Sequence, residues 1–361
     1  MTFDHVMRSD PSSMERLWYT GYPVPGGDFI FDIGLGWHPN RNVMGCFAGV
    51  AFGGKQYNFR VSRRLRPHPL EPTTRPLQNV ILEGLRRHRL TLKPNESDLA
   101  FDLEFPATMN PHEEGEHLRR GNGRVTEHVA CAQQLRAYPG WIAVAGQRRE
   151  VTEATWRDQC DHSWDIRAEM RTDESGPPLT LYPPSLYCLT TARFKRRCLH
   201  IFFKERAPGD KIYISGVEGR AFGGVSRQTL GLDDVSHEVL WSNDPLGRTL
   251  QSAEFEAAIS DGSRRWLKLR ALPGRYYLKG RLYGGLYGWA HGDDKGELHS
   301  EHDVWTLDDP PTRKLAHTLN DHVISVTDGD EVGYGIVEYG VGRSYAKYPQ
   351  VQEHPPIRGQ P

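Results

Sequence analysis

The chain has 361 residues, which is long enough for two domains or for one large β-rich domain. Its 45 Lys and Arg residues are balanced by 46 Asp and Glu, so no global basic field favours nucleic-acid binding, and no run approaches the roughly 20 apolar residues of a membrane helix. The 5 cysteines are widely spaced without a C-x-x-C pair, which argues against a zinc ribbon or a disulfide framework. We therefore expect a cytoplasmic protein with reduced thiols.

The first half of the sequence is expected to be a series of short strands that follows a loose polar segment over residues 1–16. Glycine and proline, with 37 and 25 residues, are spread along the chain, which is typical of many strands joined by turns. From Phe101 to Phe105 polar and apolar residues alternate strictly, as in a half-buried strand. Residues 106–124 are expected to form a loop. The other expected strands of this half cover residues 29–33, 43–52, 55–61, 81–92, 124–136 and 140–151.

A segment rich in proline, glycine and acids, residues 171–184, is expected to join the two halves. No stretch of twelve or more residues has a helical period. The sequence therefore predicts an all-β protein with two antiparallel barrel or sandwich halves, residues 17–170 and 171–345, followed by a flexible tail over 346–361. The strands expected in the second half cover residues 186–192, 198–204, 211–218, 235–242, 252–258, 264–271, 275–289, 301–307 and 334–339.

Ionisable side chains and tryptophans are concentrated in residues 156–167, with the sequence WRDQCDHSWDIR. Because charged side chains are rarely buried unless they are paired, this segment predicts either a buried ion-pair network or the lining of a pocket. In an extended strand its side chains would alternate between two faces, one with His162, Trp164 and Ile166 and the other with Asp161, Ser163, Asp165 and Arg167. An imidazole against apolar walls with carboxylates nearby could act as a general acid or base. A purely structural Asp–Arg pair between two sheets carries equal weight at this point.

The segment Asp161-His162-Ser163-Trp164-x-x-Arg167 resembles the signature of the tandem lipocalin-like superfamily. This group includes carotenoid 1,2-hydratases (hydroxyneurosporene synthases), AttH-like proteins and lipocalin-like Diels–Alderases. Residues 332–340 are similar to the closing strand of its second domain, whereas Cys160 and Asp165 replace an arginine and a glycine of the signature. The resemblance implies two calycin-like β-barrels in contact, a hydrophobic-ligand pocket, and chemistry on terpenoid, polyketide or aromatic compounds without a redox cofactor.

From these features we interpret the chain as a cofactor-independent lyase, hydratase or isomerase that acts on a hydrophobic aromatic or terpenoid molecule. His162 would transfer the proton, Asp161 would orient it, and Arg157 or Arg167 would hold an anionic or carbonyl oxygen. Asp158 completes the predicted catalytic set. The candidate substrate-binding residues are aromatic or imidazole side chains: Tyr22, Trp37, His38, Tyr57, Trp164 and Trp305.

Several other readings of the sequence were weighed against this one. Residues 112–117 and 291–303 contain metal-ligand residue types but no spacing such as H-E-x-x-H, so neither a metal nor another cofactor is expected. Cys160 neighbours Asp161 and His162, yet a free cysteine is more often a buried small hydrophobe than a nucleophile. The rival functions are a non-catalytic carrier of a hydrophobic ligand and an interaction protein whose central segment only holds two barrels together; a homodimer is left open.

Overall fold

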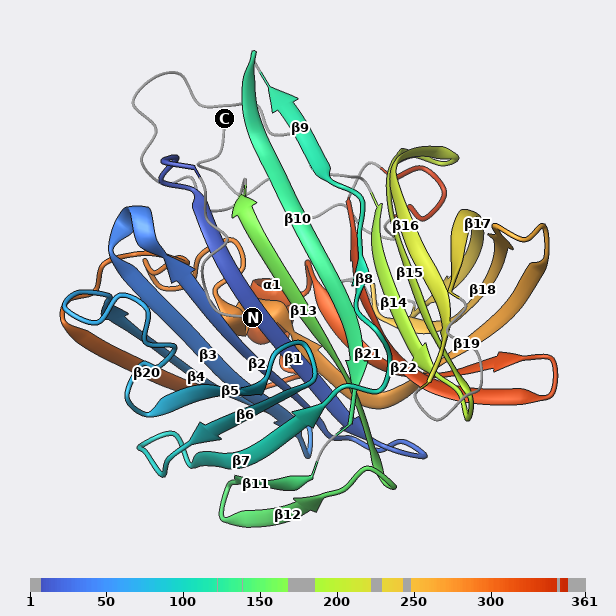
Figure 1. Ribbon diagram of the computed structural model, residues 1–361. Helices are drawn as coiled ribbons and strands as arrows, with labels where there is room; N and C mark the ends of the chain where they lie inside the picture. The colour runs from blue at the N-terminus through green and yellow to red at the C-terminus, as the bar shows by residue number, and fades with distance from the viewer. Residues whose placement is uncertain are drawn as a thin grey trace.

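The computed structural model describes residues 8–121, 123–137, 139–167, 186–221, 229–242, 248–342 and 345–349. This part of the chain consists mainly of antiparallel strands, and its helices are short, such as α1 (Pro310–Ala316) and the 3-10 turn η3 (Leu278–Arg281) (Figure 1). The predicted all-β fold class with two β halves is therefore confirmed. The expected junction over 171–184 and the tail beyond residue 349 lie outside the described residues, so the boundary at 170/171 stays a prediction.

The first half of the chain forms two sheets. The larger one contains, in spatial order, β20 (Leu298–Thr306), β4 (Lys55–Arg64), β3 (Val43–Phe52), β2 (Ile30–His38), β1 (Ser13–Pro23), β13 (Trp156–Ile166), β10 (Arg124–Arg136) and β8 (His112–Glu113), with β9 (His117–Gly121) also paired to β10. The smaller one contains β12 (Gln147–Val151), β11 (Gly140–Val144), β7 (Leu99–Pro106), β6 (Arg87–Leu92) and β5 (Leu77–Glu83). We call the larger one the main sheet.

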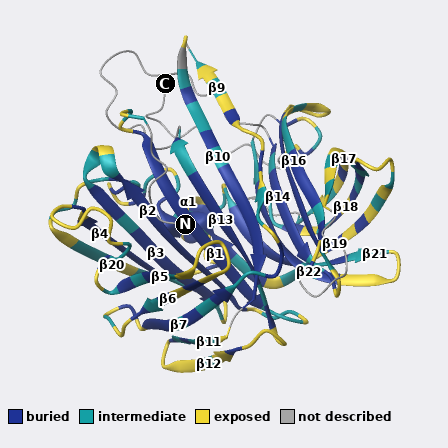
Figure 2. Cartoon of the chain, in the orientation of Figure 1, coloured by how far each residue is buried: buried dark blue, intermediate teal, exposed yellow. Residues whose placement is uncertain are grey.

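The space between these two sheets is the hydrophobic core of the first half. Alternation along β1 directs Leu17 and Tyr19 into it, where they join Leu90 of β6 and Leu103 of β7 in one apolar cluster. Each fully buried side chain of this size contributes roughly 1.5–3 kcal/mol relative to exposure. Strands with both faces covered are buried along nearly their whole length, as Figure 2 shows for β1 and β2.

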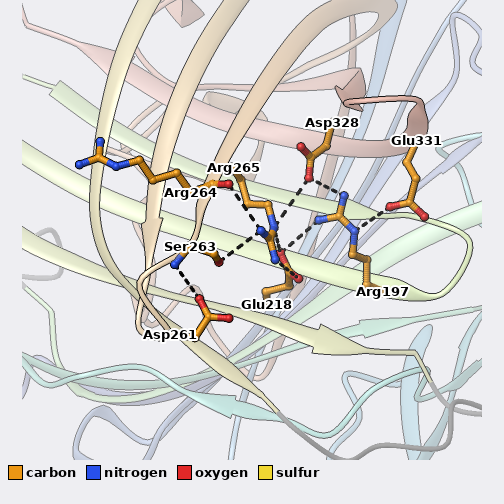
Figure 3. Close-up of polar contacts among 8 residues, drawn as sticks. All are labelled: Arg197, Glu218, Asp261, Ser263, Arg264, Arg265, Asp328 and Glu331. Carbon is orange, nitrogen blue, oxygen red and sulfur yellow. Dashed lines mark hydrogen bonds and ion pairs between the residues drawn. The ribbon is translucent and has the colours of Figure 1, made fainter.

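The second half forms a closed barrel of β14 (Leu186–Arg193), β15 (Arg197–Ala207), β16 (Asp210–Arg220), β17 (Leu230–Trp241), β18 (Leu250–Ile259), β19 (Arg264–Tyr277), β21 (Asn320–Asp328) and β22 (Glu331–Val341). Its lumen is packed with apolar side chains such as Phe203 and Phe255. A charge network joins strands that are not neighbours in the barrel order: Arg197 of β15 contacts Asp328 of β21 at 2.6 Å, and Arg265 of β19 donates to Glu218 of β16 (Figure 3). Arg197 also contacts Glu218 on the adjacent strand at 3.1 Å.

Two features connect the halves. β20 belongs to the second half of the sequence, yet it pairs with β4 from Leu298↔Arg63 to Thr306↔Lys55 at the edge of the main sheet. The outer face of the main sheet also packs against the outside of the barrel, where Trp18 and Phe47 join Tyr276 and Ile336 in a shared apolar cluster. We call this contact region the interlayer. No helix among the described residues is long and apolar enough to span a membrane.

Several expectations for individual elements were wrong. Residues 13–16 are not loose but form the buried start of β1, and residues 81–92 are not one strand but parts of the β5–β6 hairpin. The expected loop over 106–124 contains β8 and β9. The expected strand over 275–289 ends at Tyr277, because left-handed backbone at Leu282 and at the following glycines turns the chain instead of extending it.

Candidate functional site

The central segment forms a strand in the middle of the main sheet, so the alternation considered for an extended chain applies to it. β13 pairs with β1 on one side and β10 on the other, so His162 lies between Leu17 and Ala132. One face of β13 covers the core between the two sheets, and the other face meets the interlayer. The mixture of tryptophan and charge follows from this position, because each charged side chain needs a partner inside the protein.

His162 points into the core between the two sheets. Its Nε2 lies 2.6 Å from Oε1 of Glu15, a carboxylate that is fully buried, and its ring lies 5.3 Å from that of Trp164. A second polar pair occurs in the same core, where the Tyr19 hydroxyl lies 2.5 Å from Nδ1 of His88. These contacts satisfy buried polar groups within the hydrophobic core.

Asp161 points the opposite way, into the interlayer. Its Oδ1 accepts a hydrogen bond of 2.9 Å from Gln133 Nε2. Burial raises the pKa of the Asp161 carboxyl above its ordinary value, and the positive charges of Arg16 and Arg167 oppose that rise. Arg167 donates a hydrogen bond of 2.8 Å to the Ser163 hydroxyl on the same face.

The predicted site residues are therefore divided by the main sheet. Those on the interlayer side are Tyr22, His38, Arg157, Asp161, Arg167 and Trp305. Those on the core side are Trp37, Tyr57, Asp158, His162 and Trp164. Because successive residues of a strand face opposite sides, His162 and Asp161 do not share one pocket.

A narrow pocket opens in the interlayer beside Arg16. Its lining includes Phe47, Ser62 and Trp289 as well as His291, which lies in the turns after η3. The Arg16 side chain is only 4% exposed, and its guanidinium lies 5.2 Å from the centre of the Tyr283 ring. The pocket thus combines aromatic walls with a buried cation, but its volume of about 10 Å³ holds only about one water molecule, so a larger ligand would require the interlayer side chains to move.

A second buried cation, Arg281 from η3, holds the deeper part of the interlayer together. It contacts Asp32 of β2 at 2.8 Å, Glu338 of β22 at 3.4 Å and Asp321 of β21 at 3.6 Å. The Trp18 indole also donates a hydrogen bond to Asp32. Burial raises the pKa of Asp32, and the Arg281 guanidinium opposes that rise. Burial together with the nearby Glu338 carboxyl group holds the pKa of Asp321 well above its ordinary value.

Several side chains of the interlayer have a buried polar atom without a hydrogen-bond partner among the described residues, and such atoms also occur elsewhere, as in Asn79 and Trp241. Those of the interlayer include Arg16, Tyr22, His38, Ser62, Gln159, His291 and Trp305. Nearly all buried polar groups in folded proteins are paired with protein atoms or ordered water. The unpaired atoms of Arg16 and His291 are therefore positions at which a polar ligand or water could be held.

The sequence reasoning missed Glu15, Arg16, Arg281 and His291. The first two were assigned to a loose segment, although a Glu-Arg pair inside the apolar run that follows Met14 would have indicated buried charge. Nothing in the local sequence indicates a site role for Arg281, and His291 was considered only as a metal-ligand residue type. They reach the site because the turns after β19 fold over the main sheet.

The closed barrel, the two further antiparallel sheets and the polar layer between them define a mostly β protein with a barrel packed on a sheet. The chain belongs to a family of unknown function, DUF8625, whose model matches residues 1–347. No curated protein matches it.

The chain resembles several solved structures. A protein assigned as AttH from Nitrosomonas europaea has a TM-score of 0.56 and 14% identity, with 91% of this chain and 92% of that chain covered. Kievitone hydratase from Nectria haematococca follows with a TM-score of 0.45 and 11% identity, covering 91% and 89%. CghA with Sch210972 has a TM-score of 0.49 and 10% identity, covering 92% and 89%. The similarity to the AttH structure agrees with the fold that the sequence resemblance implied, and at this identity it establishes the fold alone.

Proposed function

We propose that the protein is a cofactor-independent lyase, hydratase or isomerase that moves a proton on a hydrophobic aromatic or terpenoid molecule bound in the interlayer. One observation carries the proposal: Asp161, a buried carboxyl with a raised pKa, faces the layer in which Arg16 and His291 present unpaired polar atoms. A carboxyl whose pKa moves toward neutrality is a better general acid or base at physiological pH.

In this proposal the residues of the interlayer have different roles in proton transfer, oxygen binding and contact with the apolar part of the substrate. Asp161 gives or takes the proton, and Arg16, assisted by Arg167, holds a carbonyl or anionic oxygen. The aromatic walls formed by Phe47 and Trp289 bind the apolar part of the substrate. His162, which was predicted to transfer the proton, supports the sheet from the other side through its contact with Glu15.

A carrier of hydrophobic ligands is the second candidate function. The barrel lumen contains a small pocket of about 10 Å³, lined by apolar side chains such as Phe203, Trp241 and Phe255 with His237 as a polar group, which would have to widen to hold a ligand. A carrier would use this pocket and would need no proton transfer.

The test is to incubate the protein with a panel of aromatic and terpenoid alkenes, alcohols and β-hydroxy carbonyl compounds in D2O and to follow deuterium or water incorporation by mass spectrometry. Asp161→Asn should lower the turnover found for any substrate by about 10²–10⁴-fold, because a general acid or base contributes that factor. The matched control is Asp165→Asn, on the same strand but paired with Arg8 at 2.8 Å, which should retain activity.

His162→Gln separates the two faces of β13. If this variant stays folded but loses turnover while Asp161→Asn retains it, the catalytic site lies in the core between the sheets and the proposal is wrong. Ligand binding without turnover in the wild-type protein would favour the carrier.

A further inference from the structure

A second cluster of reactive side chains lies at the far edge of the main sheet from β20. Glu114 follows β8, His117 begins β9, and Cys131 lies in β10, the strand to which both are paired. The carboxylate, imidazole and thiol atoms of these residues all lie within 4.8 Å of one another, and each residue is less than a tenth exposed.

The backbone holds these three residues in place. Glu114 N donates a hydrogen bond of 2.9 Å to Cys131 O, and His117 is the register partner of Val129, two residues before Cys131. A site built on paired strands needs little reorganisation when a ligand binds, because the strands fix the positions of the side chains.

The donor set of one carboxylate, one imidazole and one thiolate suits zinc and similar borderline cations. Zinc bonds of about 2.0–2.3 Å place two tetrahedral ligand atoms roughly 3.3–3.7 Å apart. Glu114 Oε2 and His117 Nε2 are 3.0 Å apart, so shifts of a few tenths of an ångström would admit the cation. Cys131 would bind as the thiolate and release its proton to solvent, and the Nε2 proton of His117 would move to Nδ1.

The surroundings supply outer partners for such a site. His200 from β15 of the barrel places its Nε2 3.0 Å from Oε1 of Glu114, which would orient that ligand. Lys204 Nζ lies 3.0 Å from His117 Nδ1. When the cation binds and Nδ1 carries a proton, Nδ1 no longer accepts a hydrogen bond from Lys204. The ammonium group then still has Glu127 Oε1 as a partner, 3.3 Å from Nζ.

We propose that Glu114, His117 and Cys131 form a binding site for one zinc-type divalent cation, with His200 positioning Glu114 from the barrel. The cation would link the β8–β10 edge of the main sheet to β15 and so stabilise the contact between the halves. The local sequence could not show this site, because Cys131 comes from a different strand than the other two ligands.

The test uses the full chain after removal of metals with EDTA. Competition with a chromophoric chelator should show one equivalent of tightly bound Zn²⁺, and Co²⁺ should give the charge-transfer absorption of a cobalt–thiolate bond. Cys131→Ser should abolish that absorption, and His200→Gln should weaken Zn²⁺ binding by about 10–100-fold, as expected for an outer partner of a ligand. Cys160→Ser, a change of another buried cysteine, is the control that should leave both signals intact.

Two results would overturn the proposal. One is wild-type protein that binds no stoichiometric Zn²⁺ and gives no cobalt–thiolate absorption, a result that depends on no variant. The other is equal loss of binding in the folded Cys131→Ser and Cys160→Ser proteins. Circular dichroism of each variant establishes that it is folded. Neither result bears on catalysis at Asp161.

Discussion

Replacing Arg281 with methionine should destabilise the protein more than replacing any exposed arginine. Its side chain is 1% exposed and is the central cation among Asp32, Asp321 and Glu338, which come from both halves. Methionine keeps most of the apolar volume but removes the charge. The buried carboxyl groups then lose their compensating cation inside a medium of low polarity.

The expected loss is about 3–5 kcal/mol in the free energy of unfolding at neutral pH, the usual cost of removing one partner of a buried ion pair. A smaller part, about 0.5–2 kcal/mol, comes from the contact of the guanidinium with the Trp18 ring, whose centre lies 4.6 Å away. This smaller part does not depend on carboxylate ionisation.

The loss should also depend on pH. Burial raises the pKa of Asp32 and Asp321 in the folded state. Below their unfolded pKa, near 4, both groups are protonated and stabilise the folded protein fully. This stabilisation is lost as the pH rises through the folded pKa, because the buried groups then ionise. Without Arg281 the folded pKa of both groups rises further. The destabilisation should therefore be greatest at pH 7–8 and should shrink toward the cation–π part near pH 4.

Urea denaturation at both pH values, followed by tryptophan fluorescence, measures these free energies. The matched control is Arg265→Met on the barrel, since Arg265 also makes two hydrogen bonds to one carboxylate, Glu218, but is 24% exposed (Figure 3). It should cost about 1 kcal/mol or less. Equal losses in the two variants, or a loss in Arg281→Met that does not change with pH, would refute the reasoning.

Two further predictions concern packing. Tyr19→Phe removes the hydroxyl that lies beside Nδ1 of His88, a buried imidazole whose Nε2 has no partner among the described residues. This variant should lower the free energy of unfolding by about 1–3 kcal/mol, because a buried polar atom loses its hydrogen-bond partner. An unchanged urea midpoint would contradict this prediction. Gly335→Ala would place a Cβ atom 1.7 Å from Thr191 O in the β14–β22 pair, so it should lower the melting temperature sharply. Gly45→Ala is the control, because no atom lies within 4 Å of the added Cβ, and it should leave the melting temperature unchanged. Similar melting temperatures for the two variants would show that β22 can shift without cost.

The sequence by itself determined the fold class and the approximate positions of many strands, whereas it missed the buried start of β1, the strands β8 and β9 and the end of β19 at Tyr277. Alternation over Phe101–Phe105 and over residues 160–167 is a local property with a period of two, so it could be recognised without knowing any partner strand. The signature around Asp161 and Trp164 likewise led to the lipocalin-like superfamily.

The tertiary structure decided which strands pair and which part of the protein covers each face of a sheet. β20 joins a sheet more than 230 residues away in sequence, as its pairing of Leu298 with Arg63 shows, and nothing in its residues specifies that edge. His162 and Asp161 are neighbours in the chain, but the core covers one and the barrel covers the other. Desolvation and charge pairing act between groups that are close in space, so the chemistry of a carboxyl such as Asp161 depends on residues that only the packing of the two halves brings together.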